Sequence, residues 1–364
     1  MKKRLGIIFG GRSGEHEISI RSAQTVLEQA NRDKYDLIPL AISKEGAWLT
    51  PGDSLKLFPA SVQRLFGEKF GQPSTEMISI GVANREATST LPEIIFPVLH
   101  GTYGEDGTIQ GLLEMADLPY VGCGVLASSC GMDKAFMKTL FRDAGLPICK
   151  YVWFLRDEWG ANRGATIAQV ETKLGFPCFV KPANLGSSVG VSKAIDAGTL
   201  AAAIDLAAEY DRKIIVEEGL AMREIECAVM GNDSPQASLP GEYLIKDGSK
   251  AFLDYTEKYT GTGNNEFVVP APVSDELSSK IRQLAITAFR SIGGSGLARV
   301  DFFLRTDNGA LLVNEINTMP GLTDASGFPK MWAATGNAFP KVIDDLVELA
   351  IARHADKERN RTSK

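Results

Sequence analysis

The chain has 364 residues, 44% of them hydrophobic and 23% charged, and its formal net charge is −6. This length predicts two or three domains, and the composition is ordinary for a globular protein. The acidic balance disfavours nucleic acid and anionic membranes as partners, because both bind basic surfaces.

The five cysteines are odd in number and scattered, without a Cys-x-x-Cys pair. This pattern favours reduced thiols in the cytoplasm over a disulfide framework or a zinc site. The three histidines are far apart in the sequence, which disfavours a histidine-rich metal centre. The apolar run Leu5–Phe9 is too short for a signal peptide, and no stretch reaches the roughly 20 apolar residues of a membrane span. We therefore predict a cytoplasmic protein.

The first third of the chain alternates apolar strands with helices. Strands are predicted at 5–9, 37–42 and 94–99, and helices with one apolar face around 23–30 and 109–116. This alternation indicates a parallel sheet with helices on both faces. Residues 52–92 carry no clear pattern and receive no assignment.

The rest of the chain mixes strands and helices in a different order. A helix is predicted at 133–144, where Gly145 and then Pro147 end it. The later elements are predicted as strands near 178–181, 214–217 and 224–230, a loop-rich stretch at 246–270, a helix that opens at Ser274, a hairpin at 297–318 and a last helix around 343–350. The polar tail from His354 is predicted to fray.

The predicted hairpin LARVDFFLR…ALLVNEINT carries polar residues at every second position. Residues two apart share one face of a strand, so Arg299 points with Asp301, and Glu315 points with Asn317. A three-residue loop at 307–309 would place Asp301 opposite Glu315 and Arg299 opposite Asn317. Facing carboxylates repel unless a cation lies between them, and oxygen ligands alone suggest Mg²⁺. The alternative is a solvated polar face on which Arg299 bridges the two acids.

A second polar segment, FVKPANLGSSVGV, places Lys181 at the end of a strand and a glycine–serine loop after it. Backbone N–H groups and hydroxyls in such a loop can surround phosphate oxygens, with the lysine supplying positive charge. The segment is not a P-loop, because its lysine precedes the glycines. A plain glycine–serine turn is the alternative.

The opening segment FGGRSGEHEIS does not match the G-x-G-x-x-G pattern, which disfavours a dinucleotide-dependent dehydrogenase. Glu15 lies where the chain enters a helix at the carboxyl end of a strand. Its carboxylate could stabilise the helix dipole, or it could bind a substrate ammonium. In LHGTYGEDG, His100 and Glu105 also follow the end of a strand, where open sheets bind ligands. The polar stretch DYTEKYTGTGNNE contains Lys258 and Tyr259 and is predicted to be a lid.

Taken in order, eight segments resemble the D-alanine–D-alanine ligases of the ATP-grasp superfamily. They are FGGRSGEHEIS, HGTYGEDGT, MDKAFMK, FVKPANLGSSVGV, EEGLAMREIE, DYTEKY, RVDFF and NEINTMPGLT, and they extend over nearly the whole chain. The resemblance implies an α/β protein, with α+β character in its C-terminal half, in which an ATP-grasp fold follows a Rossmann-like parallel-sheet domain. The implied units are a Rossmann-like domain at 1–122, a central ATP-grasp subdomain at 123–221, a C-terminal ATP-grasp subdomain at 222–354 and a frayed tail at 355–364.

The implied reaction joins two D-alanines to D-alanyl-D-alanine for peptidoglycan precursor synthesis. ATP first converts the carboxylate of one D-alanine to a D-alanyl phosphate, and the amine of the second attacks it, releasing ADP and phosphate. Two Mg²⁺ ions, for which Mn²⁺ may substitute, are implied as cofactors, and a homodimer as the assembly. Tyr259 resembles the dipeptide-forming type of the family rather than the depsipeptide-forming type.

The resemblance also implies site residues. Those that contact the phosphates, adenine or ribose of ATP, or bind ATP alongside the metal, are Lys134, Lys181, Ser188, Glu217, Glu218, Leu220, Glu224, Lys258, Asn314 and Glu315. The implied metal ligands are Asp301, Glu315 and Asn317. The implied catalytic and amino-acid-binding residues are Glu15, His100, Ser187, Tyr259, Arg299, Gly321, Ser326 and Gly327.

In the amino-acid sites the implied roles differ. Glu15 binds the ammonium of the first D-alanine, with His100 nearby and with Ser187 and Tyr259 hydrogen-bonded to Glu15. Arg299 and the N–H of Gly321 form the oxyanion hole, and Ser326 holds the carboxylate of the second D-alanine. Gly327 departs from the family, because relatives usually carry a larger apolar residue at this position.

Three other functions are possible on the sequence alone. A ligase of the same fold could use D-lactate or D-serine as its second substrate. A catalytically inactive nucleotide-binding module is disfavoured by the three metal-type residues together with Arg299, since a binding protein needs no oxyanion donor. A dehydrogenase is disfavoured by the imperfect glycine pattern.

Overall fold

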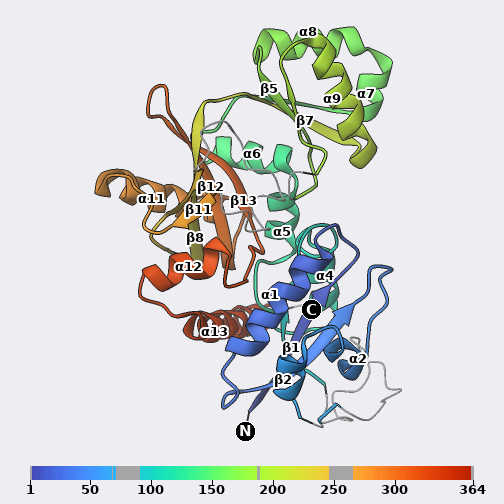
Figure 1. Cartoon of the computed structure of the whole chain (residues 1–364), viewed down its shortest axis with the longest axis vertical. Coiled ribbons are helices and arrows are strands. Elements are labelled where there is room, and N and C mark those ends of the chain that lie inside the picture. The colour runs from blue at the N-terminus through green and yellow to red at the C-terminus, as the bar shows by residue number, and fades with distance from the viewer. Residues whose placement is uncertain (1, 68, 71–90, 187–188, 246–264, 362–364) are drawn as a thin grey trace.

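The computed structural model describes residues 2–67, 69–70, 91–186, 189–245 and 265–361 (Figure 1). Its strands form three sheets: a parallel sheet near the N-terminus, a four-stranded sheet in the middle of the chain and a six-stranded sheet in the C-terminal part. The predicted class, α/β with α+β character in the second half, is confirmed. Among the described residues, no helix combines the length and the apolar composition of a membrane span.

The N-terminal sheet has the strand order β2–β1–β3 and is parallel throughout, as predicted. Its strands are β1 (Lys3–Gly10), β2 (Tyr35–Ile42) and β3 (Ile94–Pro97). Helices α1 (His16–Gln29) and α4 (Thr108–Met115) follow β1 and β3, and short helices α2 (Pro51–Leu55) and α3 (Ala60–Arg64) follow β2. Because β1 is buried along most of its length, both faces of the sheet are covered. Because β1 and β3 are parallel, their carboxyl ends lie at the same edge of the sheet.

The central part forms a four-stranded antiparallel sheet of order β4–β7–β5–β6. Its strands are β4 (Tyr151–Leu155), β5 (Cys178–Pro182), β6 (Ser192–Ala194) and β7 (Lys213–Glu218). Helices α7 (Arg156–Ala161), α8 (Arg163–Lys173) and α9 (Ala197–Tyr210) belong to the same unit (green in Figure 1). Two helices, α5 (Val125–Met132) and α6 (Lys134–Asp143), connect it to the N-terminal domain. Asp133 caps α6, its side chain accepting hydrogen bonds from two backbone N–H groups of the first turn.

The C-terminal sheet is antiparallel and has the order β11–β10–β8–β12–β13, with β9 beside β8. Its strands are β8 (Met222–Gly231), β9 (Gln236–Ala237), β10 (Gly241–Ile245), β11 (Asn265–Val268), β12 (Gly296–Arg305) and β13 (Leu311–Asn317). Its helices are α11 (Asp275–Ser291), α12 (Gly327–Ala334) and α13 (Phe339–Lys357). The predicted loop-rich stretch 246–270 is wrong at its end, where β11 pairs with β10 and the rings of Tyr243 and Phe267 lie 4.6 Å apart. Residues 246–264 lie outside the described part.

The last helix, α13, packs back onto the N-terminal domain. Its buried Leu346 and Val347 belong to the same apolar core as Leu5 and Val26. Near its end the Arg353 guanidinium lies 4.3 Å from the Tyr120 ring centroid and donates a 2.9 Å hydrogen bond to the Tyr120 carbonyl.

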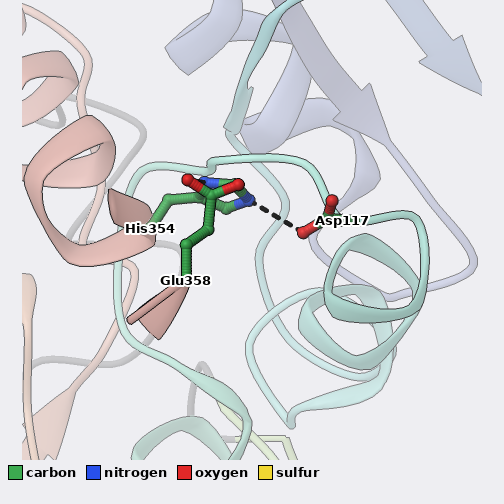
Figure 2. Close-up of side chains that lie close together, drawn as sticks. All are labelled: Asp117, His354 and Glu358. Atoms are coloured by element: carbon green, nitrogen blue, oxygen red, sulfur yellow. Dashed lines mark hydrogen bonds and ion pairs between the residues drawn. The ribbon is translucent and has the colours of Figure 1, made fainter. Parts of the chain in front are cut away.

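At the next residue, His354 Nε2 lies 3.1 Å from Asp117 Oδ1, and Glu358 lies on the other side of the ring (Figure 2). Because α13 continues to Lys357, the predicted fraying from His354 is corrected for these residues. Contacts from Arg353 and His354 to the N-terminal domain explain why this polar segment stays helical.

Candidate active site

A cleft of about 1000 Å³, open to solvent, is bounded by the central sheet on one side and the C-terminal sheet on the other. The predicted site residues in its lining are Lys134, Lys181, Glu224, Asp301, Asn314, Glu315 and Asn317. Gly186 and Glu105 complete the part of the wall nearest the N-terminal domain. Several polar side chains that converge in one concave site are typical of small-ligand binding. The structure thus brings the predicted phosphate lysines and the predicted metal ligands into one cleft.

The β12–β13 hairpin has the predicted register at the site, with Asp301 opposite Glu315 and Arg299 opposite Asn317. The loop is one residue longer than the predicted three, because the Arg305 N–H donates to the Ala310 carbonyl and the hairpin closes at this pair. A β-bulge after Asp301 compensates for the longer loop, since Phe302 pairs with Val313 and not with Asn314. Two deviations therefore cancel and leave the polar face as expected.

On its other side β12 pairs with β8, which places Glu226 opposite Asp301. Three carboxylates, Glu226, Asp301 and Glu315, thus form one row across neighbouring strands. This face is not a solvated surface, because Asp301 is 9% exposed and Glu226 is 4% exposed. Burial on this scale is unusual for acids unless cations accompany them.

Arg299 is the cation of this row. Its Nε and Nη2 donate to the two carboxylate oxygens of Asp301 over 2.6 and 2.7 Å, and its Nε lies 3.5 Å from Glu226 Oε2. Asn317 Nδ2–H donates a 3.0 Å hydrogen bond to Asp301, so the Oδ1 of Asn317 points in another direction. Arg299 pairs with two of these acids, and Lys181 adds positive charge near Glu315. The row is a set of oxygen donors, and this fits the ligand preference of Mg²⁺.

Behind the cleft, Glu217 on β7 is 3% exposed and lies between two lysines. Its Oε1 is 2.8 Å from Lys138 Nζ, and its Oε2 is 2.6 Å from Lys181 Nζ. Burial acts to raise the pKa of Glu217, but Lys138 and Lys181 outweigh it and hold the pKa well below its usual value. Lys181 is therefore fixed in a charged state at the cleft wall, with its pKa raised by Glu217 against the effect of burial.

The other predicted nucleotide residues are placed less uniformly. Lys134 Nζ donates a 2.7 Å hydrogen bond to the Leu185 carbonyl and so holds the glycine–serine loop against α6. Glu218 accepts a hydrogen bond of 2.7 Å from Lys150 N–H, and the Glu217 carboxylate faces its lysines. The side chains of Glu217 and Glu218 are therefore paired within the protein. Glu224 lines the cleft. Leu220 follows β7, in the connection to β8.

Glu15 lies just before α1 and makes no side-chain capping hydrogen bond, which disfavours the capping role. Its carboxylate instead points to the glycine loops: a Cβ at Gly101 would lie 2.7 Å from Glu15 Oε2, and one at Gly186 would lie 3.0 Å from it. These loops come from the end of β3 and from the cleft wall. Glu15 thus lies where the N-terminal domain meets the cleft, as an ammonium-binding acid would.

His100 is buried, and both nitrogens of its ring have partners. Nδ1 is 3.0 Å from the Met319 carbonyl, which can only accept, so Nδ1 carries the proton and Nε2 accepts from Ser22 Oγ over 3.1 Å. Burial lowers the pKa of His100, which keeps the ring neutral. Ser22 Oγ in turn accepts from Leu322 N–H over 3.3 Å. His100 is thus a link that fixes the 319–322 segment, including Gly321, to the N-terminal domain.

The predicted second-substrate residues lie together at the start of α12. Ser326 is 8% exposed, and its Oγ lies 2.7 Å from Thr323 Oγ1. The site explains why residue 327 is glycine: a Cβ there would lie 2.5 Å from Glu226 Oε2 and 2.8 Å from the Phe267 ring. Glu226 and Phe267 therefore occupy the space that a larger side chain would need.

Four predicted site residues, Ser187, Ser188, Lys258 and Tyr259, lie outside the described residues. Conversely, the sequence interpretation assigned no role to Lys138 or Glu226, and it noted Glu105 only as an acid after a strand end. Glu226 could have been found from its spacing of two from Glu224 on a strand, which places both on one face. Lys138 follows Lys134 by one helical turn. Its partner Glu217 is distant in the sequence, so no local signal reveals the pair.

The architecture and the cleft define an ATP-grasp ligase. A solved D-alanine–D-alanine ligase from Coxiella burnetii superposes with a TM-score of 0.80 at 34% identity, covering 98% of both chains. A D-Ala:D-Ser ligase from Enterococcus faecalis gives a TM-score of 0.79 at 33% identity, covering 96% of this chain and all of that one.

Family profiles lead to a narrower assignment. Residues 4–123 match the profile described as D-ala D-ala ligase N-terminus, and residues 140–348 match the D-ala D-ala ligase C-terminus. A D-alanine–D-alanine ligase from Heliobacterium modesticaldum is 45% identical over 365 aligned positions, which cover 100% of this chain and 99% of the relative. The chain belongs to the D-alanine–D-alanine ligase family.

Proposed function

We propose that this chain uses ATP to join two D-alanines into D-alanyl-D-alanine, through a D-alanyl phosphate, with release of ADP and phosphate. The carrying observation is the single cleft that combines Lys181, the acids of the β12–β13 hairpin and, at its N-terminal end, Glu15. A carboxylate is a poor acceptor for an amine until its oxygen becomes part of a good leaving group. The proposal extends to a peptidoglycan-precursor product and to a cytoplasmic homodimer, as the family resemblance implies.

Within this proposal, Asp301, Glu315 and Asn317 hold two Mg²⁺ ions, for which Mn²⁺ may substitute. Bound there, the ions would neutralise charge on the transferring phosphoryl group. Lys134 and Lys181 supply fixed positive charge at the same wall of the cleft. The fit rests on an oxygen-only donor set in which three acids form one row across neighbouring strands.

The two amino acids bind beside the hairpin face, close enough for the second amine to reach the acyl phosphate. Glu15 binds the ammonium of the first, and Ser326 binds the carboxylate of the second. Arg299 and Gly321 N–H stabilise the oxyanion that forms when the second amine attacks the acyl phosphate. The link from His100 to Met319 holds the Gly321 segment in place for this role.

The test measures release of ADP and phosphate with D-alanine against L-alanine, together with identification of the peptide product. D-alanine alone should support release and give the dipeptide. Release that requires added D-serine or D-lactate would favour the second candidate, a ligase that forms a mixed product. That candidate is supported by the likeness to the D-Ala:D-Ser ligase and by Glu226, whose carboxylate lies in place of an apolar side chain at residue 327.

A further inference from the structure

Glu105 is a buried acid that the proposed mechanism leaves without a role. It lies between β3 and α4, is 9% exposed and lines the cleft. Its Oε1 accepts a 3.0 Å hydrogen bond from the N–H of Gly101. An acid buried at the wall of a cleft has a desolvation cost that a merely structural hydrogen bond does not require, since an amide could accept it equally well.

The carboxylates of Glu105 and Glu15 converge on one point beside the glycine loop. A Cβ built at Gly186 would lie 3.0 Å from Glu15 Oε2 and 3.8 Å from Glu105 Oε1, and these two carboxylates supply its three nearest atoms. Both carboxylates therefore pack against the same glycine loop, so an ammonium bound at Glu15 would lie beside Glu105 as well. An ammonium has three N–H donors and no acceptor, so it can pair with two carboxylates at once.

The charges around Glu105 make it a weak acid in the free protein. Burial raises its pKa to about 8, the negative charge of Glu15 adds to the rise, and Lys134 and Arg299 oppose it in part. The remaining titratable ring at this end of the cleft, His100, is held neutral by burial. Two acids so close together raise each other's cost of ionisation, and a substrate cation beside both would lower it.

We propose that Glu105 and Glu15 form a two-carboxylate clamp for the ammonium of the first amino acid, and that Glu105 releases a proton as the ammonium enters. This inference rests on the proposed function and deepens it. The balance is simple: the Glu105 carboxylic acid and the substrate ammonium become a carboxylate paired with the ammonium, and one proton passes to solvent. Glu105 is then a specificity residue for a free α-ammonium in the first site.

The pH dependence follows with a definite sign. At pH 6.5 the clamp must lose a proton to bind, whereas near pH 8.5 Glu105 is already ionised before the substrate arrives. The KM for the first D-alanine should therefore fall about tenfold between these values, after correction for ionisation of D-alanine itself. Binding at neutral pH should also release a proton to the buffer.

The variant Glu105→Gln separates this role from a structural one, because its amide oxygen can still accept from Gly101 N–H. In the variant, the KM for the first D-alanine should change less than twofold between pH 6.5 and 8.5. At pH 8.5 this KM should be about tenfold above that of the unaltered chain. Calorimetry of D-alanine binding with a non-hydrolysable ATP analogue, in buffers of different ionisation enthalpy, should show less proton release by the variant.

Glu114→Gln is the matched control, since Glu114 is a glutamate of the neighbouring helix α4 that bonds to Tyr120 OH away from the cleft. It should keep the pH profile of the unaltered chain. Coincident profiles and equal proton release for the unaltered chain and Glu105→Gln would overturn the clamp while leaving the ligase assignment intact. Absence of D-alanine-dependent ADP release from the unaltered chain would instead overturn the proposed function.

Discussion

Two buried glutamates on either side of the active cleft show opposite behaviour. Glu217 is 3% exposed and Glu105 is 9% exposed, so burial alone would raise the pKa of each. Glu217 has Lys138 and Lys181 against its two oxygens and keeps its charge, with a strongly lowered pKa. Glu105 faces another acid, and its pKa is raised to about 8.

The difference separates a preformed part of the site from a part completed by its substrate. On the Glu217 side the protein supplies both signs of charge, and Lys181 is set for phosphates before ATP binds. On the Glu105 side, burial and the neighbouring acid outweigh the nearby cations in their effect on the pKa of Glu105. The ammonium of the substrate would add positive charge at this place. Burial sets the magnitude of such effects, while the neighbours set their direction.

The largest effect is expected from removing the charge on the preformed side with Glu217→Gln. Two buried lysines would then lack their shared anion, at a cost of about 3–5 kcal/mol in the free energy of unfolding. Because the folded pKa is lowered, this stabilisation is present above pH 4.5 and is lost as pH falls through the folded value. Urea unfolding at pH 7 checks the first point, and a pH series from 4.5 down to about 2 checks the second.

Glu209→Gln provides the control for Glu217→Gln, since Glu209 is an exposed glutamate on α9. It should unfold at the same urea concentration as the unaltered chain. Equal stability of the Glu217 variant and this control at pH 7 would mean that the two lysines are stable in the folded protein without Glu217. Glu217 would then not be part of a preformed charged site.

The second prediction concerns Arg299, whose charge faces both the hairpin acids and Glu105. Arg299→Ala should keep nucleotide binding but reduce kcat about 10²–10³-fold, as expected for the loss of an oxyanion donor. Arg305→Ala is matched, because Arg305 lies on the same strand and pairs with Asp307 at the far, exposed end of the hairpin. Its kcat should be unchanged. Turnover by Arg299→Ala within tenfold of the unaltered chain contradicts the assigned role.

The comparison also shows what the sequence could predict. Strand alternation placed Arg299 with Asp301, and Glu315 with Asn317, because the pleat has a period of two. The pairing of Asp301 with Glu315 was predicted from a loop length that was wrong, and it holds only because a bulge compensates. Alternation could not show that Lys138 meets Glu217, since that contact depends on how α6 packs against β7. For Glu15 the sequence left capping and ammonium binding open, and only the position of its carboxylate beside Gly101 and Gly186 distinguishes them.

A smaller effect is expected beside β8, where Glu226 fills the space next to Gly327. Gly327→Ala would place a methyl group 2.5 Å from Glu226 Oε2 and 2.8 Å from the Phe267 ring. Overpacking of this kind costs about 1–3 kcal/mol, so the KM for the second D-alanine should rise about tenfold while the KM for the first stays the same. Gly111→Ala, on α4 with nothing within 4 Å of its Cβ, should change neither. An unchanged second KM would show that Glu226 is free to move aside.

The smallest effect is expected from His354→Ala, which lies outside both charged regions and sets a baseline for them. His354 pairs with Asp117, whose side chain is 63% exposed, and exposed pairs of this kind contribute about 0.2–1 kcal/mol.

Asp117, His354 and Glu358 are residue types that bind metals, yet each acid lies nearest to a different ring nitrogen (Figure 2). The variant should therefore unfold within about 2 °C of the unaltered chain, and a chelator should not change the midpoint of either. A chelator-dependent drop in the unaltered chain alone would instead identify this cluster as a metal site that stabilises the contact between α13 and the N-terminal domain.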